Sequence, residues 1–203
     1  EVAYLTVRFI KFNEKRTVRY ATSLIALNKR DCDGFERMYG RKPELIFPIT
    51  SPKVDLDDVP VLTAINRPFL LFVGADFYPN IEGIVWFIEH VSPFIQLDLR
   101  IVGACCNNPT LRNKTLSNVK LEGYVDDLSS YYKSALAVVA PIFKGSGMKT
   151  KVIEAMSFGK SIIGTDEAFQ GIECDYCRMG GKCNTPSEFI HTINSLSDKL
   201  PLF

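Results

Sequence analysis

The chain has 203 residues, of which 46% are hydrophobic and 23% are charged, a mixture typical of a globular protein with its own core. Lys and Arg number 24 against 23 Asp and Glu, which gives a net charge of +1 and no electrostatic reason to expect a nucleic-acid partner. No apolar run approaches the roughly 20 residues that span a bilayer, since the longest, residues 135–143, is interrupted by Pro141.

Targeting and metal-binding signals are weak in this sequence. No signal peptide is visible, and because the chain begins at Glu1 rather than Met we expect further residues before it. Six cysteines in a chain of this length need no disulfide framework, so we expect reduced thiols and a cytoplasmic location, with membrane association open for a longer protein. The spacing of Cys174, Cys177 and Cys183 suggests zinc, but three thiols without a nearby His fall short of four ligands, so we predict no metal.

Residues 1–50 predict two helices and two short strands. The helices cover residues 1–20 and 28–39, the second of them ending at Gly40, and the strands cover residues 22–27 and 44–47. Residues 51–68 follow with Pro52, Pro60 and Pro68, which favour a linker. We therefore divide the chain into a partial N-terminal segment (1–50), a linker (51–68) and a complete domain (69–203).

Residues 69–203 alternate between strand and helix patterns, which predicts an α/β domain with a doubly wound parallel sheet. The apolar run from Phe69 to Val73 is closed by Gly74 and fits a buried parallel strand. We expect four more strands, at 97–102, 118–121, 136–140 and 161–164, and helices at 80–96, 126–134 and 149–158. The sequence Thr185-Pro-Ser-Glu188 is a capping box that opens a last helix.

The best candidate site is the turn before the helix at 149–158, because ligands of such sheets bind at the carboxyl ends of the strands. Gly145-Ser146-Gly147-Met148 offers backbone amides, and Lys149 and Lys151 follow in the first helical turn. Together with the positive helix end they form an anion site that suits a diphosphate.

Glu154 lies about one and a half turns into this helix, and helical side chains lean toward the N-terminus, so its carboxylate can reach sugar hydroxyls over the same pocket. The alternative is that Lys151 and Glu154 form a plain i,i+3 surface pair beside a flexible turn. The residues alone do not decide between the two. The spacing matches neither a Walker A loop nor a Gly-x-Gly-x-x-Gly turn.

Other polar groups favour structural roles. The turn from Gly74 to Asn80 reads as an ordinary strand-to-helix connection in which Asp76 or Asn80 caps the helix. Asp166 and Glu167 follow a strand end, where a solvated loop is expected. Asp126-Asp127 is expected to cap a helix, and we place His90 and His191 on the surface.

The order of segments from Phe69 to Leu196 resembles the C-terminal domain of GT-B glycosyltransferases of the group 1 family. The resemblance is carried by Phe72-Val-Gly74, Pro79-Asn80, Ile101-Val-Gly103, Leu121-Glu-Gly-Tyr-Val-Asp-Asp-Leu128 and, most specifically, Lys144-Gly-Ser-Gly-Met-Lys-Thr-Lys-Val-Ile-Glu-Ala-Met156. About 125 residues match in the family's order and spacing. The first 50 residues resemble the last stretch of the family's N-terminal, acceptor-binding domain, most of which is then missing.

The resemblance implies a Rossmann-like domain that binds a nucleotide diphosphate sugar, whose sugar passes to an acceptor in the cleft between two such domains. Glu154 would bond the ribose, Tyr124 and Val125 would meet the base through their backbone, and Gly74 would let the chain approach the ligand closely. The diphosphate would lie on Gly145, Ser146, Gly147, Met148, Lys149 and Lys151, with Glu154, Lys149 and Lys151 counted as catalytic.

On this basis we expect a retaining, metal-independent hexosyltransferase with no cofactor beyond its donor. The acceptor is unknown and is expected to be a saccharide, a lipid-linked saccharide or a small molecule. This part of the enzyme alone is expected to show little or no transfer, because the acceptor side is missing.

The sequence departs from the family pattern at two places. Many members carry a Glu that touches the donor sugar where this chain has Ser146, and many carry an Arg and a Lys in the first loop, which here reads Ala75-Asp76-Phe77-Tyr78. Lys149 and Lys151 must then do more of the phosphate binding. Two alternatives stay open: a nucleotide-sugar epimerase of the same architecture, and a non-catalytic nucleotide-sugar-binding or interaction module.

Overall fold

The computed structural model describes residues 2–63, 67–114, 116–145 and 147–197. The chain forms two compact units, Glu1–Ile49 and Thr50–Phe203, and each is described by itself. The segment 51–68, which we expected to be a linker, groups with the second unit.

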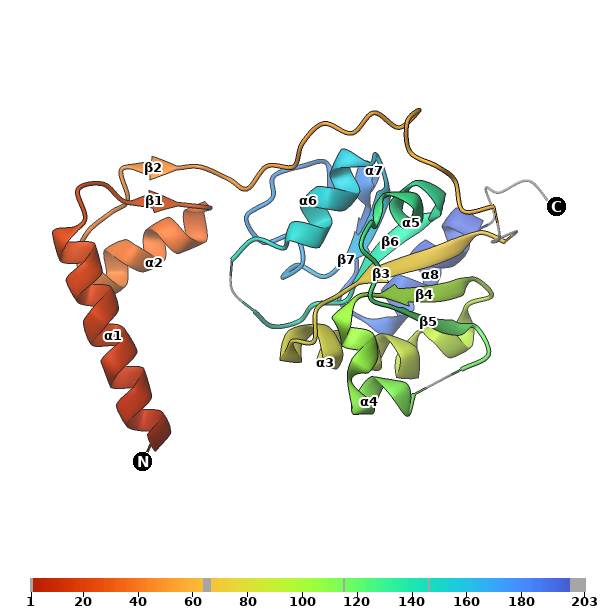
Figure 1. The fold of residues 1–203 in the computed structure, drawn as a ribbon, viewed down its shortest axis with the longest axis horizontal. Helices are drawn as coiled ribbons and strands as arrows, with labels where there is room; N and C mark the ends of the chain where they lie inside the picture. Colours follow the sequence, from red (N-terminus) through yellow and green to blue (C-terminus); the bar gives the residue numbers. More distant parts are fainter. Residues whose placement is uncertain (1, 64–66, 115, 146, 198–203) are drawn as a thin grey trace. The chain divides into compact units, whose positions relative to one another are not determined.

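The first unit contains the four elements that the sequence predicts, with shorter strands. These are α1 (Val2–Tyr20), β1 (Ile25–Ala26), α2 (Lys29–Tyr39) and β2 (Leu45–Ile46), and the two strands pair in parallel (Figure 1). The side chain of Asn28 caps α2, which ends at Gly40 in the left-handed region (φ 69°). Arg41 ties the elements together, since its Nη1 donates to the carbonyl oxygens of Val18 at 2.8 Å and Ala21 at 2.7 Å.

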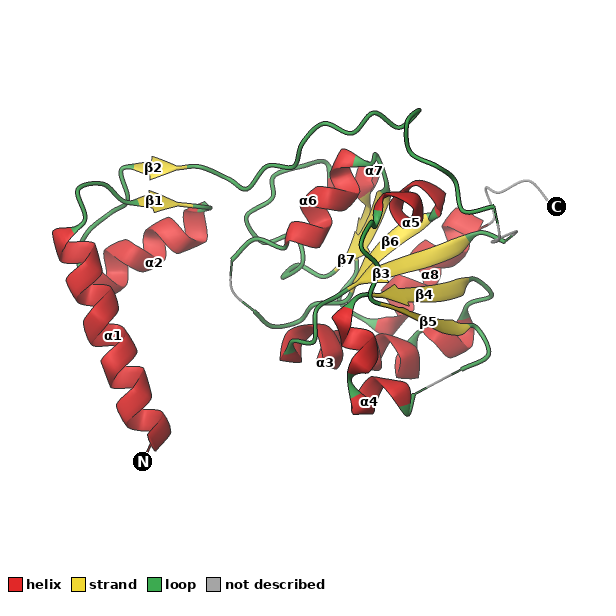
Figure 2. Ribbon diagram, in the orientation of Figure 1, coloured by secondary structure: helices red, strands yellow, loops and turns green. Residues whose placement is uncertain are grey.

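The second unit is a six-stranded parallel sheet with helices on both of its faces (Figure 2). The strand order is β5-β4-β3-β6-β7-β8, and each neighbouring pair runs parallel. The strands are β3 (Phe69–Val73), β4 (Asp98–Val102), β5 (Val119–Gly123), β6 (Ala137–Ala140), β7 (Ser161–Gly164) and β8 (Gly180–Lys182). The helical segments are α3 (Tyr78–His90), η1 (Ser92–Phe94), η2 (Ala104–Asn107), α4 (Pro109–Arg112), α5 (Ser129–Ser134), α6 (Thr150–Ser157), α7 (Tyr176–Met179) and α8 (Pro186–Ser197).

The central strands are buried on both faces, as the apolar run at residues 69–73 predicts. Phe69 to Phe72 in β3 and all four residues of β6 are at most 1% exposed. Because helices cover both faces of a parallel sheet, these strands carry apolar side chains without alternation. The doubly wound fold expected from the sequence is therefore confirmed.

The sheet has one strand more than the five we expected. The sixth strand, β8, begins Gly180-Gly181, and both glycines have positive φ angles, 129° and 139°. A Cβ at Gly180 would lie 2.4 Å from the carbonyl oxygen of Ile162, so the strand packs closer to β7 than any other residue allows. Glycines without β-branched neighbours carry no strand signal, which is why the pattern missed this element.

The helix expected at residues 80–96 is shorter and shifted. It begins two residues earlier, at Tyr78, and ends at His90, after which Ser92–Phe94 form a 3₁₀ turn. Pro93 lacks the amide proton that an α-helix needs at this position, so the helix ends before it. The apolar spacing in the sequence continues past this point, which is why the predicted helix was too long. The capping box before α8 is confirmed, since Glu188 accepts from the Thr185 amide at 3.0 Å.

The proline-rich segment 51–68 is bound along the second unit. The ammonium group of Lys133 donates to the carbonyl oxygens of Leu56 and Val59, and the Leu62 amide donates to Ser134 Oγ at 2.9 Å. Residues 64–66 lie outside the described part of the chain. Among the described helices, none combines the length and apolarity needed to cross a membrane.

Candidate functional site

The strand order reverses between β3 and β6, which lie side by side at the centre of the sheet (Figure 1). The loops that follow them, residues 74–77 and 141–149, therefore leave the sheet at the same edge. In open parallel sheets this reversal creates the crevice in which ligands bind. The predicted phosphate-binding turn is thus at the position in the fold where a ligand is expected.

The turn after β6 has the backbone of a glycine-dependent loop. Gly145 and Gly147 have φ angles of 144° and 69°, values that other residues adopt only with strain. Ser146, which we also assigned to the site, lies outside the described residues. Met148 is buried, and Lys149 is the N-cap of α6 with an extended backbone. Because a lysine side chain cannot accept a hydrogen bond, it leaves the first amides of α6 for another acceptor.

Lys149 faces inward and already has a counter-charge. Its Nζ lies 2.8 Å from Glu167 Oε1 and 2.9 Å from the carbonyl oxygen of Gly147, and its side chain is 12% exposed. The solvated loop expected at Asp166-Glu167 is therefore wrong for Glu167, whose side chain is 19% exposed, although Asp166 is 68% exposed.

The position of Glu167 depends on Thr165, which is buried at the end of β7. The Thr165 amide donates to the carbonyl oxygen of Ala140 at 3.3 Å, and its hydroxyl donates to the carbonyl of Ile142. These bonds tie the loop after β7 to the loop after β6. The sequence could not reveal this contact, since it joins segments that are far apart in the chain.

Lys151 lies deeper than Lys149. Its Nζ is 4.3 Å from the centroid of the Phe72 ring and donates to Asn80 Oδ1 at 2.8 Å. Burial lowers the pKa of Lys151 from 10.5 to about 7, although the nearby carboxylate of Glu154 acts in the opposite direction. The alternative of a plain surface pair with Glu154 is wrong, because Lys151 is partly buried and its ammonium group is bonded to Asn80 instead.

Asn80 joins the loop after β3 to the helix α6. Its Nδ2 donates to the carbonyl oxygen of Ala75 at 3.0 Å, while its Oδ1 accepts from Lys151. The expectation that Asn80 or Asp76 caps α3 is wrong, because the N-cap is Phe77, whose side chain cannot accept a hydrogen bond. Asp76 instead accepts from Asn108 Nδ2 at 2.8 Å.

Gly74 is fixed by its neighbours in the loops after β3 and β4. Its amide donates to the carbonyl of Val102 at 3.0 Å, and its carbonyl accepts from the Cys105 amide at 3.1 Å. A Cβ at this position would lie 2.7 Å from Cε1 of Phe72. The need for glycine here is thus explained by packing, and close approach to a ligand stays a prediction.

Glu154 is held by a buried tyrosine that the sequence analysis missed. The hydroxyl of Tyr132, a residue in α5 that is 1% exposed, donates to Glu154 Oε2 at 3.0 Å. The Tyr132 ring stacks on Phe158, with centroids 5.0 Å apart and planes at 16°. Only the tertiary contact between α5 and α6 brings these residues together.

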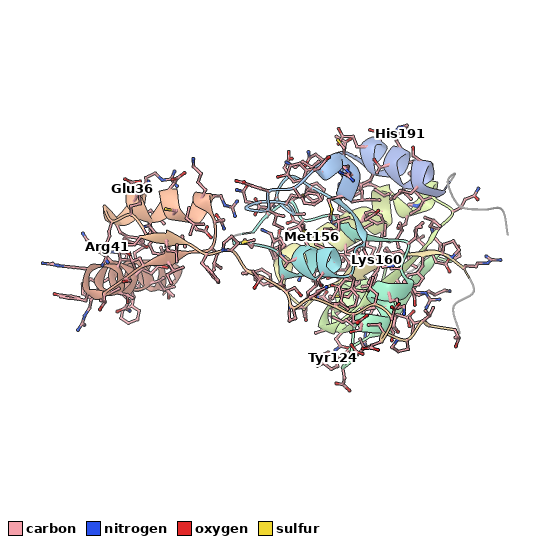
Figure 3. All side chains as sticks on the ribbon, turned by 90° about the horizontal axis from the view of Figure 1, so that it is seen from above. Glu36, Arg41, Tyr124, Met156, Lys160 and His191 are labelled. Carbon is pink, nitrogen blue, oxygen red and sulfur yellow. The ribbon has the colours of Figure 1, made fainter. Side chains whose placement is uncertain are left out.

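Tyr124 and Val125, assigned to the base, follow the outermost strand β5. The Tyr124 side chain is 72% exposed and projects from the surface (Figure 3). The strand order places β4 and β3 between this segment and β6. A contact with a base through the backbone of these two residues therefore stays a prediction.

The cysteines expected to be reduced are free thiols, including Cys105 and Cys106 in η2. Cys183 is buried, Cys174 is partly buried and Cys177 is exposed. Among the residues that the structure describes, no group of three or more His, Cys, Asp or Glu side chains is placed to hold a metal ion.

A cavity of about 560 Å³ lies beside α3, and neither Lys149 nor Lys151 lines it. Its lining combines acidic, amide and aromatic side chains, among them Asp76, Glu82, Trp86 and Asn108. Glu82 is paired with Lys144 at 2.7 Å, so part of its charge is already neutralised.

One family model matches most of the second unit. Residues 67–198 match the family described as glycosyl transferases group 1. A curated relative, an uncharacterized 44.6 kDa protein in the cps region of Klebsiella pneumoniae, is 23% identical over 177 residues, which cover 79% of this chain and 43% of the relative.

Two solved structures illustrate the similarity of fold. Anabaena HepE, in complex with UDP and glucose, has a TM-score of 0.67 at 14% identity, with 90% of this chain and 55% of HepE covered. A glycosyltransferase from Rickettsia africae has a TM-score of 0.69 at 15% identity, with 91% and 56% covered. The chain thus spans about half the length of these relatives.

The family match covers most of the chain and falls on the whole six-stranded sheet. It includes the turn before α6 and the two lysines that follow it. Similar folds occur in GT-B glycosyltransferases, as the resemblance implied. The chain belongs to the group 1 family of glycosyl transferases.

Proposed function

We propose that this chain is the donor-binding half of a retaining, metal-independent hexosyltransferase that uses a nucleotide diphosphate sugar. The observation that supports this most is the turn at 145–149, which lies at the strand-order reversal with Lys149 and Lys151 directed inward. The diphosphate would lie on the turn and on the first amides of α6. The ribose would lie against Glu154.

The chemistry of transfer fits such a site. When the bond from sugar to diphosphate breaks, negative charge develops on the leaving nucleotide, and fixed amides and ammonium groups stabilise it without a metal. Lys151 contributes most when its ammonium is charged, and an incoming diphosphate favours that form by opposing the effect of burial. Lys149 would exchange part of its contact with Glu167 for a phosphate oxygen.

The acceptor and the donor sugar belong to this proposal as well. HepE was solved with UDP and glucose, so a uridine nucleotide and a hexose are the first donors to test here. The acceptor is proposed to be a saccharide, a lipid-linked saccharide or a small molecule that binds to the missing half. The 203-residue chain alone is then expected to transfer little or no sugar.

Calorimetric titration of UDP, GDP and ADP into this chain in the presence of a chelator tests donor binding. We expect at least one nucleotide to bind, and the combined change Lys149→Ala and Lys151→Ala to abolish that binding. Affinity for none of the three would contradict the proposal, and so would binding that the double variant retains. Binding that requires a divalent ion would overturn the metal-independent part.

The role of Glu154 separates a transferase from a non-catalytic module. In the full-length protein, Glu154→Ala should lower turnover strongly. The anomeric configuration of the wild-type product, compared with that of the donor sugar, tests whether the enzyme is retaining. If Glu154→Ala leaves the turnover rate unchanged, the result would favour the non-catalytic interaction module instead.

A further inference from the structure

The most constrained side chain near the proposed donor site belongs to Tyr132. It is 1% exposed, and its hydroxyl donates to Glu154 Oε2 at 3.0 Å. A buried hydroxyl is expected to have a hydrogen-bond partner, and this carboxylate supplies it. Burial and the charge of Glu154 both raise the pKa of Tyr132, so the phenol stays protonated and remains a donor.

The Tyr132 ring is braced by the helix that carries Glu154. Phe158, the C-cap residue of α6, lies four residues after Glu154 and stacks on the ring at 5.0 Å with planes 16° apart. The hydroxyl and the carboxylate are therefore held in one geometry from two sides. The backbone is fixed as well, since Ser157 Oγ donates to the Glu154 carbonyl at 2.7 Å.

This arrangement has a consequence for the free carboxylate oxygen. A glutamate side chain has three rotatable bonds, and ordering it on ligand binding costs conformational entropy. The bond from Tyr132 fixes Oε2 in advance and leaves Oε1 for another donor. A pair of adjacent hydroxyl groups, such as those of a ribose, is the type of donor that a fixed carboxylate binds well.

We propose that Tyr132 is a positioning residue that orients Glu154 toward the ribose hydroxyls of a nucleoside diphosphate, an inference that rests on the function proposed above. Tyr132 acts through Glu154 and itself lies behind the site. The affinity that it supports is therefore for the nucleoside part of the ligand, while the diphosphate depends on Lys149 and Lys151.

The chain offers a matched control in the neighbouring residue. Tyr131 also donates to a carboxylate, Glu122 Oε2, at 3.4 Å, and this carboxylate is paired with Arg100. Tyr131→Phe removes a phenolic hydroxyl from the same helix without affecting Glu154. A loss specific to Tyr132→Phe is then due to the bond with Glu154 and not to the loss of any hydroxyl from α5.

The test compares UDP, GDP and ADP with pyrophosphate, which has no ribose and is measured by displacement of the bound nucleotide. We expect Tyr132→Phe to weaken the tightest-binding nucleotide by about three- to tenfold and pyrophosphate by less than about twofold. Tyr131→Phe should change neither affinity by more than about twofold. Phe158→Leu keeps the Tyr132 hydroxyl and loosens the packing of its ring. It should weaken nucleotide binding less than Tyr132→Phe does, again with little effect on pyrophosphate.

Two results would overturn the inference. Unchanged nucleotide affinity in both Tyr132→Phe and Phe158→Leu would show that Glu154 needs no positioning, while the proposed function stands. Equal losses of nucleotide and pyrophosphate affinity would show that Tyr132 supports the fold of the whole site. If the wild-type chain binds none of the three nucleotides, the proposed function fails first and this inference fails with it.

Discussion

The loops after β3 and β6 leave the sheet side by side, yet they are built differently. The loop after β3 is tied by its own backbone, since the amide of Gly74 donates to the end of β4 and its carbonyl accepts from the Cys105 amide in the segment after β4. The loop after β6 carries two positive-φ glycines and is followed by two inward lysines. The loop after β3 is thus held by backbone hydrogen bonds, whereas the loop after β6 leads into positively charged side chains.

Asn80 connects the loop after β3 to α6, because its Nδ2 donates to the Ala75 carbonyl and its Oδ1 accepts from Lys151. Under the proposed function, this contact would hold a cation for the phosphates in a chain that lacks the Arg and Lys that many relatives place in the first loop. The Asn80 amide in α3 and the face of Phe72 in β3 together hold a lysine that comes from α6. The comparison predicts that changes in the first loop act on stability and that changes around the second act on ligand affinity.

The largest expected effect is that of Lys151→Met. Nucleotide affinity should fall by about 30- to 100-fold, because a buried cation opposite the diphosphate is lost. The free energy of unfolding should rise by about 1–3 kcal/mol at pH 7, because burying the ammonium is costly without a ligand. Calorimetry and thermal melting on the same variant measure both effects, and a variant that loses stability would contradict the buried-cation interpretation.

Gly74→Ala should act mainly on the free energy of unfolding, whereas Lys151→Met acts mainly on nucleotide affinity. A Cβ would lie 2.7 Å from Cε1 of Phe72 and 3.3 Å from Sγ of Cys105, so we expect a loss of about 1–3 kcal/mol from overpacking. Nucleotide affinity of the folded protein should fall less than in Lys151→Met, because the Cβ displaces the Phe72 ring beneath the Lys151 ammonium but leaves the charge in place. Denaturant unfolding and titration below the melting range check this. Lost affinity at full stability would mean that Gly74 contacts the ligand.

Nucleotide affinity should depend on pH above about 7. Burial lowers the pKa of Lys151 to about 7, and a bound diphosphate raises it again, so binding takes up a proton above this pH. Affinity should therefore fall by up to about tenfold per pH unit between pH 7 and the pKa of the complex. Lys151→Arg, which stays charged, should flatten the profile. If nucleotide affinity falls equally steeply with pH in Lys151→Arg, the proton taken up on binding belongs to another group.

The smallest expected effect is that of Glu167→Gln. Removing the charge opposite Lys149 leaves that lysine free to pair with phosphate, so nucleotide affinity should rise by about two- to fivefold. The same titration measures it. A fall in affinity would show instead that Glu167 holds Lys149 in place for the ligand.

The sequence predicted the parts of the fold that have a local signal. Phe69–Val73 and Ser161–Gly164 are strands at the predicted residues, and the capping box at Thr185 opens α8 as expected. It missed β8, because Gly180-Gly181 pairs with β7 through close approach and not through side-chain packing. It also extended the helix after β3 through Pro93, where apolar spacing continued past the proline.

The sequence pointed to the turn before α6 as a candidate site, but it did not predict the contacts of the lysines there. Glycines followed by Lys149 and Lys151 before a helix indicate an anion site by type and order alone. The partners of these lysines, Glu167 and Asn80, come from other strand ends and have no local signal. The same holds for Tyr132, which meets Glu154 only because α5 packs on α6.

The most direct test is to follow the backbone amide signals of this chain by NMR during a titration with the tightest-binding nucleotide diphosphate. The account predicts that the amides of Gly145, Gly147, Thr150 and Lys151 shift first and most. It would be contradicted if these signals stay in place while amides around the cavity beside α3, at Asp76 and Asn108, move instead.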